Sequence, residues 1–184
     1  MGFSAFQNRD VRLYLIQHAI QPYFTLSFIF PAYIFLISKN VILIGVLLSI
    51  AYVLGHLAII AGFLTDYIVN TRIYDFILSI LSGSVLVTSF FIYSNSISFI
   101  FIIFLILGLI HTLKGTNHRK VLRHIVNSYK DFKNIWVLTH SIRTFTAIIL
   151  LYFSLFILGL KGVLLILGFY MLLVHTPLIF LINY

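Results

Sequence analysis

Several stretches of this sequence run for about 20 residues with almost no charged side chain, a pattern that soluble folds do not carry. A helix needs roughly 20 consecutive apolar residues to cross the hydrocarbon core of a bilayer. Only 9% of the 184 residues are charged and 61% are hydrophobic, whereas a soluble domain carries roughly 25% charged residues. Too little polar surface remains to cover a water-facing shell. The sequence therefore predicts an all-α, polytopic membrane protein whose solvent is the lipid bilayer.

The apolar runs predict six transmembrane helices that fill nearly all of a single domain, residues 1–184. Their approximate bounds are 18–37, 41–64, 73–93, 97–113, 135–158 and 163–182. The segment 114–134, between the fourth and fifth spans, is basic and amphipathic. We expect it to lie as a helix in the anionic inner leaflet, with a partner surface as the alternative role.

Lys and Arg fall mainly on one side of the predicted topology. Nine of the twelve lie in the N-terminal stretch, the turn between spans 2 and 3, and the segment 114–134. Lys39 and Lys161 lie on the other side, and Arg143 lies inside the fifth span. Because cytoplasmic loops carry an excess of Lys and Arg, we expect both termini in the cytoplasm and the chain in the plasma membrane. The N-terminal stretch is typical of a cytoplasmic lead-in, not of a signal peptide.

Composition and motifs argue against several functions. The net charge of +8 is explained by cytoplasmic loops, so we expect no nucleic acid partner. The chain has no Cys and no Glu, which removes thiolate ligands and thiol nucleophiles. His111 and His118 are seven residues apart, but no carboxylate or thiolate completes a tetrahedral set, so neither a metal nor a cofactor is expected. Without a nucleophile elbow or a phosphate loop, no enzyme activity is predicted.

The connection between the second and third spans carries the most specific motif. It resembles the G-x-L-x-D-(basic)-x-G-(basic)-(basic)-(basic) signature of the major facilitator superfamily, at the position where that family carries it. The matching residues are Gly62, Leu64, Asp66 and Arg72, whereas Tyr67 and Val69 replace the central basic residue and the glycine. The opening Asn8-Arg9-Asp10-Val11-Arg12 and Gly108 near the end of span 4 fit the same family, closest to its drug- and siderophore-exporter branch.

The resemblance covers almost the whole chain, but as the N-terminal half of a family member. It implies a six-helix bundle built as a 3+3 repeat, which would need a second half to alternate access. A local reading of the motif remains open, in which Asp66 and Arg72 only end one span and begin the next. In that reading Arg72 pairs with Asp75 three residues later.

Small residues share one face of the second span. They recur at spacings of four, three and four: Ala51, Gly55, Ala58 and Gly62. Such a stripe lets another helix approach closely. In the resembled family this helix packs against the other half, so the face is a candidate contact for a second copy or another membrane subunit. Packing against a neighbouring span of the same chain is the alternative.

Polar residues inside the predicted spans are candidates for a permeation path. Gln17, Gln21 and Thr25 share one face of the first span at i, i+4 and i+8. In the resembled family the first span lines the central cavity, so these three are candidate substrate-binding residues. Hydrogen bonding between helices is the alternative.

His140 and Arg143 form a second candidate cavity pair on the fifth span, at spacing i,i+3. Arg143 could also extend back to the headgroups. The histidines expected within the spans are His56, His140 and His175, and they are candidate titratable groups. Each of them could instead be a hydrogen-bonded packing residue.

Two functions from different classes follow. The first is a half-size transporter of small solutes that works as a homodimer or with a partner half. The second is a transport-incompetent accessory subunit that scaffolds a larger membrane complex. The apolar fourth span, and the expectation that no carboxylate lies inside the bundle, favour the second. The Asp66 and Arg72 motif favours the first.

Overall fold

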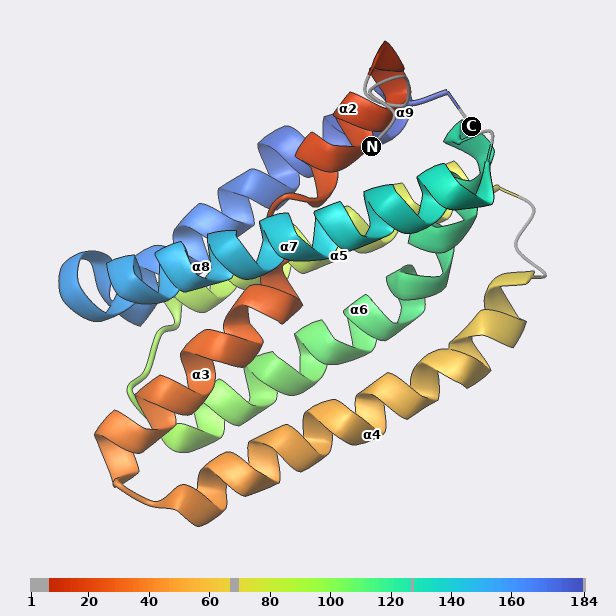
Figure 1. Ribbon diagram of the computed structural model, residues 1–184. Coiled ribbons are helices and arrows are strands. Elements are labelled where there is room, and N and C mark those ends of the chain that lie inside the picture. The colour runs from red at the N-terminus through yellow and green to blue at the C-terminus, as the bar shows by residue number, and fades with distance from the viewer. Residues whose placement is uncertain (1–6, 67–69, 127, 184) are drawn as a thin grey trace.

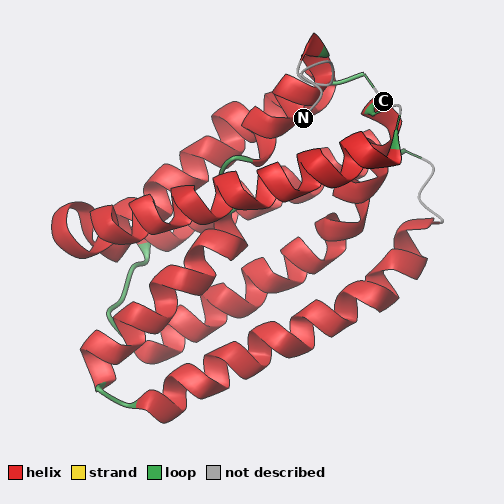
Figure 2. Ribbon diagram, in the orientation of Figure 1, coloured by secondary structure: helices red, strands yellow, loops and turns green. Residues whose placement is uncertain are grey.

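The computed structural model describes residues 7–66, 70–126 and 128–183, and every regular element in these ranges is a helix (Figures 1 and 2). The prediction of an all-α fold is confirmed. The first helices are α2 (Arg9–His18), α3 (Pro22–Ser38), α4 (Val41–Asp66), α5 (Thr71–Phe91) and α6 (Ile97–Ile125). They are followed by α7 (Tyr129–Phe153), the π-helical η1 (Ser154–Leu158), α8 (Gly159–Phe169), the π-helical η2 (Tyr170–His175) and α9 (Thr176–Leu181).

Four helical runs in the described part of the chain are long and apolar enough to cross a membrane: Arg9–Ser38, Thr71–Phe91, Ile97–Ile125 and Tyr129–Leu181. A shorter apolar stretch, Val41–Leu54, forms the start of α4. Large hydrophobic side chains cover much of the outer surface; Ile42, Phe91 and Phe156 are each more than 70% exposed. Such a surface suits lipid and not water.

The first apolar run is broken where proline requires it. A residue before proline is disfavoured in the α region, and Gln21, which precedes Pro22, has extended backbone angles (φ −122°, ψ 110°). Pro22 then begins α3, where its missing N–H is tolerated. The break leaves the last carbonyl groups of α2 without helical partners, so other groups can bond to them.

The last apolar run folds back on itself between α7 and α8 (Figure 1). The reversal occurs at Gly159, whose backbone (φ 67°, ψ 171°) lies in a region that is essentially restricted to glycine.

We predict that Gly159→Ala destabilises the protein by about 1–2 kcal/mol, because a Cβ atom is strained at this backbone conformation. The measurement is SDS-induced unfolding in mixed micelles. Gly45→Ala in α4 is the matched control, because its Cβ would meet no atom within 4 Å. Equal stability of the two variants would contradict the prediction.

Three pairs of helices build the main core: α3 with α7, α4 with α6, and α5 with α8. The buried side chains between them are aliphatic or aromatic and include Leu26, Phe30, Phe104, Leu107 and Leu164. A smaller second core lies at the end of the bundle that holds α2 and α9, and it contains Val11, Tyr14, Leu122, Ile135 and Ile182.

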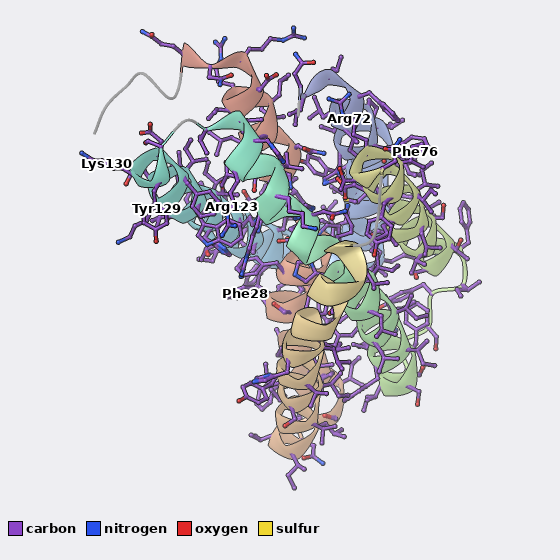
Figure 3. All side chains as sticks on the ribbon, turned by 90° about the vertical axis from the view of Figure 1, so that its right-hand side faces the viewer. Phe28, Arg72, Phe76, Arg123, Tyr129 and Lys130 are labelled. Atoms are coloured by element: carbon purple, nitrogen blue, oxygen red, sulfur yellow. The ribbon has the colours of Figure 1, made fainter. Side chains whose placement is uncertain are left out.

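The two described ends of the chain lie at the same end of the bundle. Asn8 donates a hydrogen bond to the carbonyl of Ile125 at 3.1 Å, and Arg72 donates one to the carbonyl of Ile182 at 3.1 Å. Arg72 bonds to Ile182 and Arg123 lies over the ring of Phe132, and both Ile182 and Phe132 belong to the second core at this end. Figure 3 looks from the side of Figure 1 where this end lies and shows Lys130 and Arg123 toward one side of the view and Arg72 toward the other. Basic side chains therefore gather at one end.

Helix α6 continues well beyond Leu113, the expected end of the fourth span. Its extension buries Val121 and Leu122 in the second core, while Arg119 and Arg123 lie over the rings of Trp136 and Phe132. Residues 114–125 are thus part of one long helix, packed against α2 and α7.

Candidate functional site

Polar side chains meet in the interior where α2, α5, α6 and η2 come together. The members of this polar cluster are His18, Asp75, Ser79, Lys114, His118 and His175, and each is at most 4% exposed. Polar groups in an apolar interior are costly unless they are paired or bind something. The cluster is therefore the first candidate for a functional site.

Asp75 and Lys114 form the charged pair of the polar cluster. The Lys114 Nζ atom lies 3.4 Å from Asp75 Oδ1 and donates a hydrogen bond of 2.7 Å to Ser79 Oγ. The Ser79 hydroxyl donates in turn to the Asp75 carbonyl at 2.6 Å. Asp75 and Ser79 are one turn apart on α5, so one face of that helix presents both groups to α6.

Three histidines from separate elements meet beside this pair. His18 is the last residue of α2, His118 lies one turn after Lys114 on α6, and His175 ends η2. The His18 ring lies edge-on to the His118 ring at 4.2 Å and is 5.6 Å from the His175 ring, centroid to centroid. One ring nitrogen from each histidine lies within 4.8 Å of the other two.

The hydrogen bonds of His18 and His175 determine their tautomers. His18 Nδ1 lies 3.0 Å from the carbonyl oxygen of Tyr14, which can only accept, so Nδ1 carries the proton. His175 Nδ1 lies 3.3 Å from Ser79 Oγ, whose own proton is already donated to the Asp75 carbonyl. His175 Nδ1 is therefore also the donor. Both Nε2 atoms are left with a free lone pair.

A narrow pocket opens beside the three histidines. Its polar lining includes Gln17, Gln21, His111, Lys114 and Ser82. Gln21 Nε2 lies 2.6 Å from His111 Nδ1, so two of the lining residues bond to each other. The space open to the centre of a water molecule is about 20 Å³, and roughly 10–15 Å³ is needed for one water. The pocket thus admits a water molecule or a single ion.

The predicted glutamine face of the first span is buried, and two of its three residues reach this pocket. Gln17 lies 3.5 Å from the carbonyl of His175, and both Gln17 and Gln21 line the pocket. Thr25 is 1% exposed but lies one turn further on, outside the lining. Gln17 and Gln21 therefore belong to the candidate site, and Thr25 does not.

The other predicted residues lie apart. His140 is on the outer side of α7, where its ring contacts Trp136 at 4.8 Å. His56 is exposed, and its ring contacts the ring of Tyr52, one turn away, at a tilted angle. Of the three candidate titratable histidines, only His175 belongs to the polar cluster.

Arg143 is 4% exposed and points inward, not to the surface. Its Nε atom donates a 3.0 Å hydrogen bond to the carbonyl of His18, one of the groups freed by the break before Pro22. A cation at the C-terminus of a helix is favourable. Arg143 therefore acts as a cap for α2.

We predict that Arg143→Met destabilises the protein by about 2 kcal/mol, because the buried His18 carbonyl loses its charged donor. The midpoint of SDS-induced unfolding is the measurement. Lys133→Met is the control, since Lys133 is an exposed cation on the same helix. If both variants unfold at the wild-type midpoint, Arg143 does not cap α2.

Parts of two predicted sets lie outside the described residues. For the transporter-type motif, these are the surroundings of Gly62, the side chains of Leu64 and Asp66, and the whole of Tyr67 and Val69. Arg72 is described and bonds to the Ile182 carbonyl. In the small-residue face of α4, the surroundings of Gly55, Ala58 and Gly62 lie outside the described residues, and Ala51 packs at the edge of the main core.

Sequence reasoning missed His18, Ser79 and Lys114 as site residues, and it set aside His118. It also expected no carboxylate inside the bundle, which is wrong: Asp75 is 2% exposed and lies beside Lys114. The usable signal was the spacing of Lys114 and His118, one turn apart on a helix that also carries a long apolar run.

No protein-family model matches this chain, and no curated protein and no solved structure matches it either. The class of the protein therefore follows from its own fold: the described residues form helices only, four helical runs among them are long and apolar enough to cross a membrane, and charged and imidazole side chains form a buried site.

Proposed function

We propose that this chain is a half-size membrane transporter of the major facilitator type, which moves small solutes as a dimer or with a partner half. In this proposal the chain crosses the plasma membrane six times. The spans are α2 with α3, then α4, α5, α6, α7, and finally α8 with η2 and α9. A 26-residue α4 and a terminal run that folds back at Gly159 support six crossings over four.

The observation that carries the proposal is the symmetry of the helix contacts. Each half of a major facilitator contains two inverted repeats of three spans. Exchanging spans 1, 2 and 3 with spans 4, 5 and 6 turns the α4–α6 contact into the α7–α3 contact. The same exchange leaves the α5–α8 pair unchanged and turns α5–α6 into α8–α3, a much smaller contact, whereas the α3–α4 contact has no α6–α7 counterpart of comparable size among the described residues. The three most extensive helix pairs therefore fit a 3+3 repeat.

The position of the charges supports cytoplasmic termini. The N-terminal and C-terminal helices lie at one end, and Arg72, Arg123 and Lys130 lie at that end too. A basic end is typical of the cytoplasmic side.

The polar cluster supports transport over a purely structural role. Buried ionisable groups in membrane bundles mark ion and proton pathways, and π-helical segments often occur at functional sites. Here the cluster takes His18 from the helix break before Pro22 and His175 from the π-helical η2. Irregular backbone in two spans therefore meets at the charged site.

The first experiment is the mass of the intact particle extracted in mild detergent. The proposal expects two copies of the 21.2 kDa chain, or one copy with another six-helix half. A particle built from unrelated subunits would contradict it.

A flux experiment tests transport itself. Proteoliposomes are incubated with a defined library of small solutes, and the retained solutes are measured by mass spectrometry. We expect at least one solute to accumulate with wild type and not with Lys114→Met, whereas Lys133→Met accumulates it normally. If no solute accumulates above the level found in empty liposomes, the proposal that the chain transports solutes is wrong.

One observation favours an accessory subunit as the second candidate function. The pocket beside the histidines has room for one water or ion, not for a solute. A scaffold of this kind would co-purify in fixed stoichiometry with other membrane proteins, which the particle mass reveals.

A further inference from the structure

We propose that His18, His118 and His175 bind one divalent transition-metal ion of the zinc class, with Asp75 as the fourth ligand. The inference does not depend on transport, since a bound metal would serve a transporter and a scaffold equally. Within the described part of the chain, the three histidines are the one group of three or more His and Asp side chains whose ligand atoms come together, and Asp75 lies beside them with its Oδ1 3.8 Å from His118 Nε2.

The spacing of the histidines suits a tetrahedral ion. Zinc–nitrogen bonds of about 2.0–2.1 Å place neighbouring ligand atoms roughly 3.3 Å apart and imidazole centroids roughly 5 Å apart. The three centroid distances are 4.2, 5.6 and 6.3 Å, and the ligand atoms lie within 4.8 Å of each other. Movements of about 1 Å, which small side-chain rotations supply, bring the nitrogens to bonding distance.

The surrounding hydrogen bonds prepare two of the ligands. Metal-binding histidines donate their second ring N–H to a carbonyl or a similar acceptor, which fixes the tautomer and the ring orientation. His18 donates from Nδ1 to the Tyr14 carbonyl, and His175 donates from Nδ1 to Ser79 Oγ. Both therefore present a free Nε2 lone pair.

The unsatisfied atoms of the polar cluster point to the same ion. His18 Nε2 and His118 Nε2 are fully buried, and neither has a hydrogen-bond partner among the described residues, whereas the buried Asp75 Oδ1 has Lys114 Nζ at 3.4 Å as its ion-pair partner. Such orphaned buried atoms are rare in native structures and call for a missing partner. His118 Nε2 and Asp75 Oδ1 lie 3.8 Å apart, too far for a hydrogen bond but close to the spacing of two ligands on one metal.

The types of ligand atom select the class of metal ion. A carboxylate has about four lone-pair sites, so the contact with Lys114 leaves Asp75 able to bind a metal. Three imidazoles and one carboxylate suit zinc, copper, nickel or iron, whereas calcium and magnesium require mostly oxygen ligands. The adjacent pocket is lined by all three histidines and has room for one ion.

Metal binding to the full chain in detergent tests the proposal. The protein is stripped with EDTA and titrated with ZnCl₂ by calorimetry, and bound zinc is counted by elemental analysis. We expect one zinc per chain, and at least 100-fold weaker binding in His118→Gln and in His175→Gln. His56→Gln is the control, because His56 is exposed and lies on α4, which contributes no residue to the cluster. Ser79→Ala, which removes the acceptor for His175, should weaken binding by about 10–100-fold.

Two measurements on the wild-type protein keep the test valid if a variant fails to fold. CoCl₂ should give the intense visible absorption of tetrahedral cobalt, and zinc should raise the melting temperature above that in EDTA. Less than 0.1 zinc per chain, a weak octahedral cobalt spectrum, or an equal loss of binding in His56→Gln would each overturn the proposal.

Discussion

Replacing Asp75 by Asn should destabilise the protein by about 3–5 kcal/mol, the usual effect of removing one partner from a buried ion pair. The variant leaves Lys114 charged in an apolar interior, where it is 4% exposed and lies 3.4 Å from the lost carboxylate oxygen. The Ser79 hydroxyl, the other partner of Lys114, is neutral and compensates only part of this charge. SDS-induced unfolding, followed by the fluorescence of Trp136, gives the free energy of unfolding.

A double variant shows how much of the destabilisation comes from the broken ion pair and how much from the loss of the Asp75 carboxylate itself. Asp75→Asn combined with Lys114→Met removes both charges, so it should be clearly more stable than Asp75→Asn. Asp131→Asn is the control, because Asp131 lies at the first turn of α7 near the surface. If the double variant is no more stable than Asp75→Asn, the charges of Asp75 and Lys114 do not stabilise each other.

Replacing Gly168 by Leu should destabilise the protein by roughly 3 kcal/mol, at the upper end for overpacking a core. Gly168 lies in α8 against Leu86 and Val87 of α5. A Cβ atom there would lie 2.8 Å from Val87 Cγ2 and 3.1 Å from the Val87 backbone nitrogen. A backbone atom cannot rotate away, so the two helices would have to separate.

The comparison is with Gly115→Leu in α6, whose Cβ would meet no atom within 4 Å. Because Leu is a better helix former than Gly, this control should be neutral or more stable by up to about 1 kcal/mol. The same SDS titration measures both variants. Equal losses at the two positions would show that α5 and α8 do not pack through Gly168.

The helical class could be predicted because apolar runs and polar breaks are local properties of the sequence. Ser38-Lys39-Asn40, for example, marks a helix end that the structure also has at Ser38, where Lys39 adopts a left-handed conformation. The break before Pro22 was within reach of the same reasoning, since proline restricts the residue before it. It was overlooked because hydropathy alone does not register a change in backbone direction.

The polar cluster could not be predicted from local patterns. Asp75 and Lys114 are 39 positions apart, and each taken alone resembles a charge at the edge of a span. Only the packing of α5 against α6 places them together in the interior. His111 and His118 were considered as a pair along one helix, whereas the structure joins His118 to His18 and His175 from other elements. Partners from distant segments leave no periodic signal in the sequence.

The two separate cores have a consequence for cooperativity. The larger core ties α3 to α8 along most of the bundle, whereas the smaller one joins α2, the end of α6 and the start of α7. The three-residue break before Pro22 is the covalent link between them in the first span. Regions with fewer buried apolar contacts open first in native proteins. The α2 end is therefore a unit that can exchange its amide hydrogens without global unfolding, and its opening would expose the imidazole of His18 while α3 stays packed.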